Sequence, residues 1–259
     1  MSEEGYVSEG SPVLLYIDRR RSYLVRAVEG EVLHTHKGVI DLGSLVGKRY
    51  GEYVESHRGE RFWILKPLIY DLITSFRRKT QVIYAKDMGL ILVYAGIGPG
   101  SLVVEGGTGS GFLTAMLAYH VRPSGRVYSY EIREEFLKLA KRNLESAGLL
   151  EYVELKNKDI TEGIDEVGVD AVVLDLATPW KAVPHAHRSL KGGGVFVSFS
   201  PTIEQVVKTS EALSQHGFID VWTIEALVRE YKVKKGETRP EMRMIGHTGY
   251  ITFARKILD

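Results

Sequence analysis

The stretch Ser101–Leu117, SLVVEGGTGSGFLTAML, decides the fold of this chain. A short apolar run is followed by a burst of glycine and then by apolar residues at helical spacing. This pattern predicts a β-strand that ends in a tight turn and passes directly into an α-helix. Such a turn usually holds a nucleotide-like ligand against backbone N–H groups at the helix N-terminus. The spacing of the glycines indicates which ligand this is.

The glycine spacing argues against two common nucleotide sites. A P-loop needs Lys followed by Ser or Thr after its last glycine, whereas Phe112 follows Gly111 here. A dinucleotide site needs G-x-G-x-x-G, and the glycines Gly107, Gly109 and Gly111 bring the third one residue too early. With Glu105 in front, the run reads E-x-G-x-G-x-G. It therefore resembles the first motif of class I S-adenosylmethionine (AdoMet) methyltransferases.

The chemistry of AdoMet fits this motif. AdoMet has no pyrophosphate, but it has a cationic sulfonium and a zwitterionic amino-acid tail. We expect the acidic side chain of Glu105 to interact with the ammonium group of that tail, and the glycines to let the backbone approach the ligand. A glycine turn without any ligand is the alternative.

Acidic residues follow the later strands of the same pattern. Glu131 ends the next strand, where a carboxylate can bind both ribose hydroxyls of an adenosine. After the third strand, Asp159 could accept a hydrogen bond from the adenine amino group while Ile160 stacks on the ring; an Asp that only caps a turn is the alternative. Asp175 ends the fourth strand, at the sheet edge where open parallel sheets bind ligands, and is predicted to be functional.

Strands and helices alternate through the second part of the chain. Strands are expected over 102–106, 126–131, 152–157, 170–175 and 194–200, and helices over 111–121, 134–148, 180–191 and 203–217. This alternation predicts an α/β, Rossmann-like fold with a parallel sheet and helices on both faces. Two long strand-like runs at 218–233 and 247–258 predict an antiparallel C-terminal hairpin at one edge of that sheet.

A second, smaller domain precedes the α/β part. Short alternating apolar segments separated by polar or glycine breaks predict a small antiparallel β domain. A strand-like run becomes helical after Pro67, so we expect domains over 1–66 and 67–259.

Composition limits the function further. The chain has no cysteine, which excludes disulfides, thiolate zinc sites and cysteine nucleophiles. No apolar run approaches the length of a transmembrane helix, and the polar, acidic N-terminus is unlike a signal peptide, so a cytoplasmic protein is expected. The net charge is only +1, but basic clusters occur at 18–26, 75–81 and 229–243. Such clusters modestly favour binding to nucleic acid.

The chain as a whole resembles the tRNA (adenine-N1)-methyltransferases of the TrmI type, which modify the T-loop. The segments that carry the resemblance are GVIDLGSLVGKRYG, RKTQVIYAKD, VVEGGTGSGFLT, YSYEIREEF, LDLATPW and RPEMRMIGHTGYITFARK. It implies methylation of N1 of adenine 58 of tRNA; archaeal members modify adenine 57 as well, and the sequence leaves open whether this chain does so. One residue departs from the family pattern: the family commonly has proline where Ala177 stands, which affects the geometry of the loop after Asp175.

The resemblance also implies roles for individual residues. AdoMet contacts would come from Ser110, Gly111, Phe112, Glu131, Phe136, Asp159 and Ile160. Asp175 would be the catalytic carboxylate, and Tyr84 would border the target adenine. Arg78, Lys79, Arg239 and Arg243, from two of the basic clusters, are candidates for phosphate contacts with tRNA. The family is expected to form a homotetramer, because tRNA contacts come from more than one subunit.

Two other functions remain open from the sequence. One is a class I methyltransferase with another acceptor, such as a protein isoaspartyl group or a small tetrapyrrole precursor. The other is a non-catalytic RNA-binding subunit. A metal site is not expected. The histidines of the pairs His34/His36 and His185/His187 are two residues apart, and residues two apart do not lie on the same face of a helix.

Overall fold

The computed structural model describes residues 5–258. The chain divides into two compact units, Met1–Ser75 and Phe76–Asp259. The boundary expected between residues 66 and 67 lies before helix α1 (Ile69–Thr74), whereas the two units divide after this helix.

The first unit contains the small antiparallel β structure that was predicted. Its four-stranded sheet has the order β2-β1-β6-β5, and β3 and β4 form a separate hairpin. The strands are β1 (Pro12–Asp18), β2 (Arg21–Arg26), β3 (Val32–Thr35), β4 (Gly38–Asp41), β5 (Tyr53–Glu55) and β6 (Arg61–Leu65), with a 3-10 turn at Gly43–Leu45. Alternate residues such as Val13, Leu15, Phe62 and Ile64 point inward and form its core.

The second unit is built on a seven-stranded sheet of order β12-β15-β11-β10-β7-β8-β9. Its strands are β7 (Leu102–Gly106), β8 (Arg126–Tyr130), β9 (Val153–Lys156), β10 (Val169–Leu174), β11 (Leu190–Ser200), β12 (Phe218–Glu225) and β15 (Tyr250–Lys256). The five strands β7 to β11 are parallel, and β15 pairs antiparallel with both β11 and β12. The predicted α/β fold is confirmed, including the antiparallel edge.

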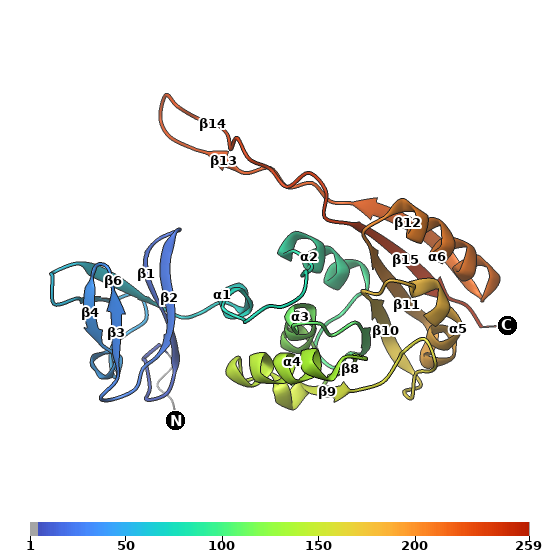
Figure 1. Ribbon diagram of the computed structural model, residues 1–259, viewed down its shortest axis with the longest axis horizontal. Helices are drawn as coiled ribbons and strands as arrows, with labels where there is room; N and C mark the ends of the chain where they lie inside the picture. The colour runs from blue at the N-terminus through green and yellow to red at the C-terminus, as the bar shows by residue number, and fades with distance from the viewer. Residues whose placement is uncertain (1–4, 259) are drawn as a thin grey trace. The chain divides into compact units, whose positions relative to one another are not determined.

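Helices cover both faces of this sheet (Figure 1). They are α2 (Ala85–Tyr94), α3 (Phe112–Val121), α4 (Glu134–Ser146), α5 (Pro179–Ser189) and α6 (Ile203–Gln215). Helices α2, α3 and α4 lie on one face, and α5 and α6 on the other. The helical patterns predicted α3 to α6 but not α2, whose Tyr94 packs against Trp222 and Phe253 of the antiparallel edge strands.

The order of the strands fixes the place of the site. From β7 the chain proceeds to β8 and β9 on one side, and then crosses to β10 on the other side of β7. The carboxyl ends of β7 and β10 therefore lie side by side at the point where the winding reverses. Open α/β sheets bind their ligands at such a point.

The C-terminal hairpin differs from the prediction in one respect. The run expected to be one strand over 218–233 ends at Glu225, and β13 (Tyr231–Lys232) pairs instead with β14 (Arg239–Pro240). Figure 1 shows β13 and β14 on an arm that extends away from the sheet between β12 and β15. Among the described residues, no helix is both long and apolar enough to cross a membrane.

Candidate functional site

The glycine turn between β7 and α3 is shaped by close contacts. Gly107 has a φ of +94°, and a Cβ atom there would lie 2.2 Å from the carbonyl oxygen of Asp175. Gly111 has a φ of +83° and is the N-cap of α3. Only glycine adopts these conformations readily, so the turn can lie directly against the loop that follows β10.

Glu131 is bound to the glycine turn. Its Oε2 accepts from the backbone N–H of Gly109 at 3.0 Å, and its Oε1 accepts from that of Arg133 at 3.0 Å. The side chain is only 5% exposed. A carboxylate has about four lone-pair sites, so Glu131 can still accept from two further hydroxyl groups.

In the loop after β9, one carboxylate oxygen of Asp159 caps a turn and the other is available to a ligand. Its Oδ1 caps a turn by accepting from the backbone N–H and the hydroxyl of Thr161, both at 2.8 Å, while Oδ2 makes no hydrogen bond to a described residue. Ile160 beside it is buried. The hydroxyl of Tyr130 anchors the far end of the loop: it donates to Glu166 at 2.6 Å and accepts from the N–H of Asp165 at 2.9 Å.

A segment without regular secondary structure, residues 77–83, lies against the glycine turn. Its beginning is held by Asn143 of α4, whose Nδ2 donates to the carbonyls of Arg77 and Ser110, both at 2.8 Å. Thr80 then shares a hydrogen bond of 2.9 Å with the Ser110 hydroxyl. The sequence pattern did not predict this position, because no periodicity marks the segment.

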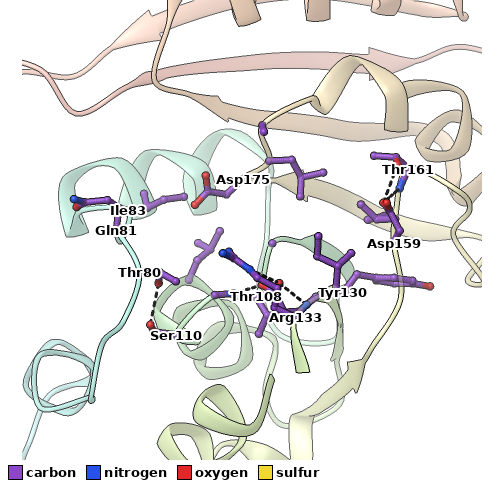
Figure 2. Close-up of a pocket in the computed structure, with 18 of the residues that line it drawn as sticks. Thr80, Gln81, Ile83, Thr108, Ser110, Tyr130, Arg133, Asp159, Thr161 and Asp175 are labelled. Carbon is purple, nitrogen blue, oxygen red and sulfur yellow. Dashed lines mark hydrogen bonds and ion pairs between the residues drawn. The ribbon is translucent and has the colours of Figure 1, made fainter. Parts of the chain in front are cut away.

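These elements enclose a cavity of about 500 Å³ (Figure 2). Of the residues selected from the sequence, those that line it are Gly107, Gly109, Ser110, Phe112, Glu131, Asp159, Ile160 and Asp175. Residues not anticipated also line it, among them Thr80, Gln81, Val82, Ile83, Arg133, Lys158, Thr178 and Lys181. The volume and the mixed polar and apolar lining are typical of a site for a cofactor-sized ligand.

Asp175 is the carboxylate with the most unusual environment in this cavity. Burial raises its pKa to about 6, from its ordinary value of 3.8. Its backbone N–H donates to the carbonyl of Gly106 at 2.8 Å. Its carboxylate oxygens have no hydrogen-bond partner among residues 5–258, so they are free to receive a ligand.

Glu105 does not lie where the sequence placed it. Its side chain is 1% exposed and points away from the cavity, and its Oε2 accepts from Thr114 at 2.6 Å and from Ser129 at 2.5 Å. Burial raises the pKa of Glu105 to about 8, although both hydroxyl groups lower it. The two hydrogen bonds tie β7 to α3 and β8, and Glu105 does not line the cavity, so it is not placed to face an ammonium group there.

Three other selected residues, Tyr84, Gly111 and Phe136, lie outside the cavity lining. Tyr84 is the N-cap residue of α2 and is 43% exposed, next to the lining residue Ile83. Phe136 is buried beneath the Arg133 guanidinium, which lies 3.8 Å from the ring centroid. It therefore supports a lining residue rather than contacting the cavity itself.

The four basic residues selected for RNA contact are all exposed. Arg78 and Lys79 lie in segment 77–83, and Arg239 and Arg243 lie on the C-terminal arm. Lys79 pairs loosely with Glu135 at 4.0 Å. Both pairs are accessible to a large polyanion.

Comparison with known proteins adds the family. The family model described as "tRNA methyltransferase complex GCD14 subunit" matches residues 63–239. A protein of Methanocaldococcus jannaschii named tRNA (adenine(57)-N(1)/adenine(58)-N(1))-methyltransferase TrmI is 37% identical, over 93% of this chain and 94% of that protein.

Two solved structures are similar over nearly the whole chain. One is a tRNA (m1A58) methyltransferase TrmI from Aquifex aeolicus, with a TM-score of 0.82 and 31% identity over 98% of this chain and 100% of that one. The other, from Thermotoga maritima, is described as an AdoMet-dependent O-methyltransferase; it has a TM-score of 0.89 and 39% identity over 98% and 96%. The resemblance inferred from the sequence is confirmed: the chain belongs to the GCD14 family of tRNA methyltransferase subunits.

Proposed function

We propose that this protein transfers the methyl group of AdoMet to N1 of adenine 58 in the T-loop of tRNA. The observation that carries the proposal is Asp175, an unpaired carboxylate in the cavity at the winding reversal of the sheet. The family membership supports tRNA as the acceptor. The relative from Methanocaldococcus jannaschii is named for adenine 57 as well as adenine 58, so position 57 is a second position to examine.

The residues of the cavity fit AdoMet. Glu131 is placed to bind the ribose hydroxyls, and the unpaired Oδ2 of Asp159 to accept from the adenine amino group with Ile160 against the ring. The glycine turn lets the backbone approach the amino-acid part of the ligand, because no side chain intervenes at Gly107 or Gly109. When bound, AdoMet supplies an electrophilic methyl group.

Asp175 then acts on the acceptor. Adenine N1 already carries a lone pair, so the enzyme has to position the base and stabilise the positive charge that develops on it. The Asp175 carboxylate is placed to accept a hydrogen bond from the N6 amino group and to stabilise this charge. N1 lies on the Watson–Crick edge, so the base has to leave the folded T-loop to reach the cavity. Tyr84, exposed beside Ile83, offers it a stacking surface.

Mapping the product tests this function. Purified protein, AdoMet and an unmodified tRNA transcript are incubated, and the nucleosides are analysed by mass spectrometry with digestion fragments that separate positions 57 and 58. We expect 1-methyladenosine at position 58. A control transcript that has uridine at position 58 and no adenine at position 57 should contain none.

The same assay examines oxygen methylation as the second candidate. The similar structure from Thermotoga maritima is described as an O-methyltransferase, which favours an oxygen acceptor. Ribose methylation would appear as a 2′-O-methyl nucleoside, which fragments differently from a base-methylated one. A product methylated only on oxygen would contradict the proposed reaction.

Basic residues of the arm are expected to bind tRNA phosphates. Replacing both Arg239 and Arg243 with alanine should raise the KM for tRNA about tenfold and reduce the slope of log affinity against log salt by about two. The affinity for AdoMet should not change, because neither residue lines the cavity. Filter binding of tRNA at several salt concentrations, with calorimetry of AdoMet, measures both.

A charge-matched control variant is available on α4. Lys138 and Lys141 are exposed and pair with Glu134 and Glu145 on the same helix. Replacing both with alanine removes the same formal charge away from the arm, and should leave tRNA affinity within about twofold. An equal loss of tRNA affinity in both double variants would show that net charge, rather than the position of the residues on the arm, determines binding.

We further propose that the protein assembles as a homotetramer through the arm. Val233 and Met242 of the arm are 80% and 85% exposed, and Leu227, Val228 and Ile245 are more than half exposed. Exposed apolar side chains that gather into a patch usually mark an interaction surface. The exposed apolar residues of this arm are therefore candidates for a subunit contact.

Light scattering after size-exclusion chromatography tests the assembly. The wild-type protein is expected at the mass of four chains, and replacing Val233 and Met242 with aspartate should produce smaller species. The matched control replaces Val167 and Ile203, which are 78% and 59% exposed on other parts of the chain, and should remain tetrameric. A monomeric wild-type protein would contradict the proposal.

A further inference from the structure

The loop after β10 is held at its start but lacks a cap of its own at its end. The N–H of Asp175 donates to Gly106, which joins the start of the loop to the glycine turn. Helix α5 begins after Thr178, whose side chain makes no capping hydrogen bond. Residues 176–178 line the cavity. The second half of this functional loop therefore needs a partner from another element.

Gln205 of α6 is that partner. Its Nε2 donates to the carbonyl oxygen of Ala177 at 3.0 Å. Its Oε1 accepts from the N–H of Thr202 at 3.2 Å and from the Thr202 hydroxyl at 2.9 Å, as part of a capping box at the start of α6. Because Oε1 faces two donors, the NH₂ group has to point the other way, toward Ala177.

The position of the Asp175 carboxylate depends on this loop. Its oxygens have no hydrogen-bond partner among the described residues, so no polar contact of the side chain holds the carboxylate, and the course of the main chain has a large influence on where it lies. Position 177 is alanine, which has no ring to fix its φ. A hydrogen bond to the Ala177 carbonyl therefore supplies a restraint that the local sequence lacks.

We propose that Gln205 is a positioning residue for Asp175, acting through the carbonyl of Ala177. The inference rests on the proposed role of Asp175, and it adds a residue that lies outside the cavity lining. Gln205 has two separable functions in this arrangement: its oxygen caps α6, and its NH₂ group holds the catalytic loop.

Two substitutions separate these functions. Gln205→Glu keeps the oxygen that accepts from Thr202, and a negative charge suits a helix N-terminus, but an oxygen now faces the Ala177 carbonyl. Thr202→Ala removes the cap and leaves the NH₂ group. We expect Gln205→Glu to lower kcat at least ~10-fold with little change in Tm, because misplaced catalytic groups lose rate steeply. Thr202→Ala should lower Tm by ~2–4 °C with kcat within about twofold.

Removing the whole side chain examines the route through residue 177. Gln205→Ala should lower kcat as Gln205→Glu does, because both variants lack the NH₂ group that donates to the Ala177 carbonyl. The AdoMet Kd, measured by calorimetry, should stay within about twofold in the Gln205 variants. A purely structural defect would lower AdoMet affinity and Tm together.

Hydrogen exchange gives a readout that does not depend on the acceptor. Amides of residues 176–178, measured by mass spectrometry without tRNA, should exchange faster in both Gln205 variants than in the wild type or in Thr202→Ala. Unchanged exchange and kcat in Gln205→Glu would overturn the proposal, as would an equal loss of kcat in Thr202→Ala. A wild-type protein that makes no 1-methyladenosine contradicts the proposed function instead, and the exchange experiment still tests the loop.

Discussion

Replacing Asp175 with alanine is expected to lower kcat at least ~10²-fold, the usual cost of losing electrostatic stabilisation in a transition state. The carboxylate faces the cavity without another partner, so no described side chain can replace it. Asp175→Asn is the sharper variant, since it preserves shape and removes only the charge. Single-turnover methylation of a tRNA transcript measures the chemical step directly. A rate near that of the wild type, in a folded protein, would contradict the catalytic role.

The pH dependence of the same residue provides the control. Burial raises the pKa of Asp175 to about 6, and only the ionised form can stabilise positive charge, so the wild-type rate should rise with pH and level off above pH 6. The Asn variant should lose this rise. A rate that is independent of pH between 5 and 7 in the wild type would argue against the ionised carboxylate.

The contribution of Asp175 to the free energy of unfolding should fall as pH rises, whereas the methylation rate should increase. The folded state holds the proton of Asp175 more tightly than the unfolded chain, so this residue's contribution is most favourable below pH ~4 and is lost as pH rises through 6. At neutral pH the buried charge therefore opposes folding, and Asp175→Asn should raise the free energy of unfolding by up to about 3 kcal/mol. Denaturant titration at pH 7 measures this. Lower stability would show that the substitution damages the fold.

Replacing Gly107 with alanine should have the second largest effect. The added Cβ would lie 2.2 Å from the carbonyl oxygen of Asp175, and the backbone has a φ of +94°. Overpacking and backbone strain together should lower the free energy of unfolding by about 3 kcal/mol. The contact also displaces the loop of Asp175, so kcat/KM should fall about 10²-fold, as expected for a catalytic group moved by about 1 Å. Denaturant titration and steady-state kinetics measure the two effects.

Gly148→Ala is the matched control for backbone strain. Gly148 follows the end of α4, has a φ of +66°, and has no neighbouring atom within 4 Å of the position of an added Cβ. This variant should lose only about 1 kcal/mol of stability and keep its kinetic constants within about twofold. If Gly107→Ala lost no more stability and activity than Gly148→Ala, the close approach of the glycine turn to the Asp175 loop would not contribute to either.

Much of the site could be predicted because a Rossmann-like sheet converts sequence order into spatial order. Glu131, Asp159 and Asp175 each follow a strand, and the carboxyl ends of parallel strands meet at one edge of the sheet. Local sequence therefore indicated three residues of the cavity and the glycine turn between them. The same reasoning failed at Glu105, which lies inside β7 one residue before its end, with its side chain against α3.

The amino-acid sequence by itself determined the alternation of strands and helices, the glycine turn and the strand-end carboxylates. These features depend on residues close together in the chain, where backbone preference and apolar periodicity act. Only the tertiary structure placed segment 77–83 at the cavity through Asn143, sent Gln205 to the carbonyl of Ala177, and separated the arm from the sheet edge. The contacts of Asn143 and Gln205 join residues far apart in the chain and depend on tertiary geometry, which no local pattern encodes.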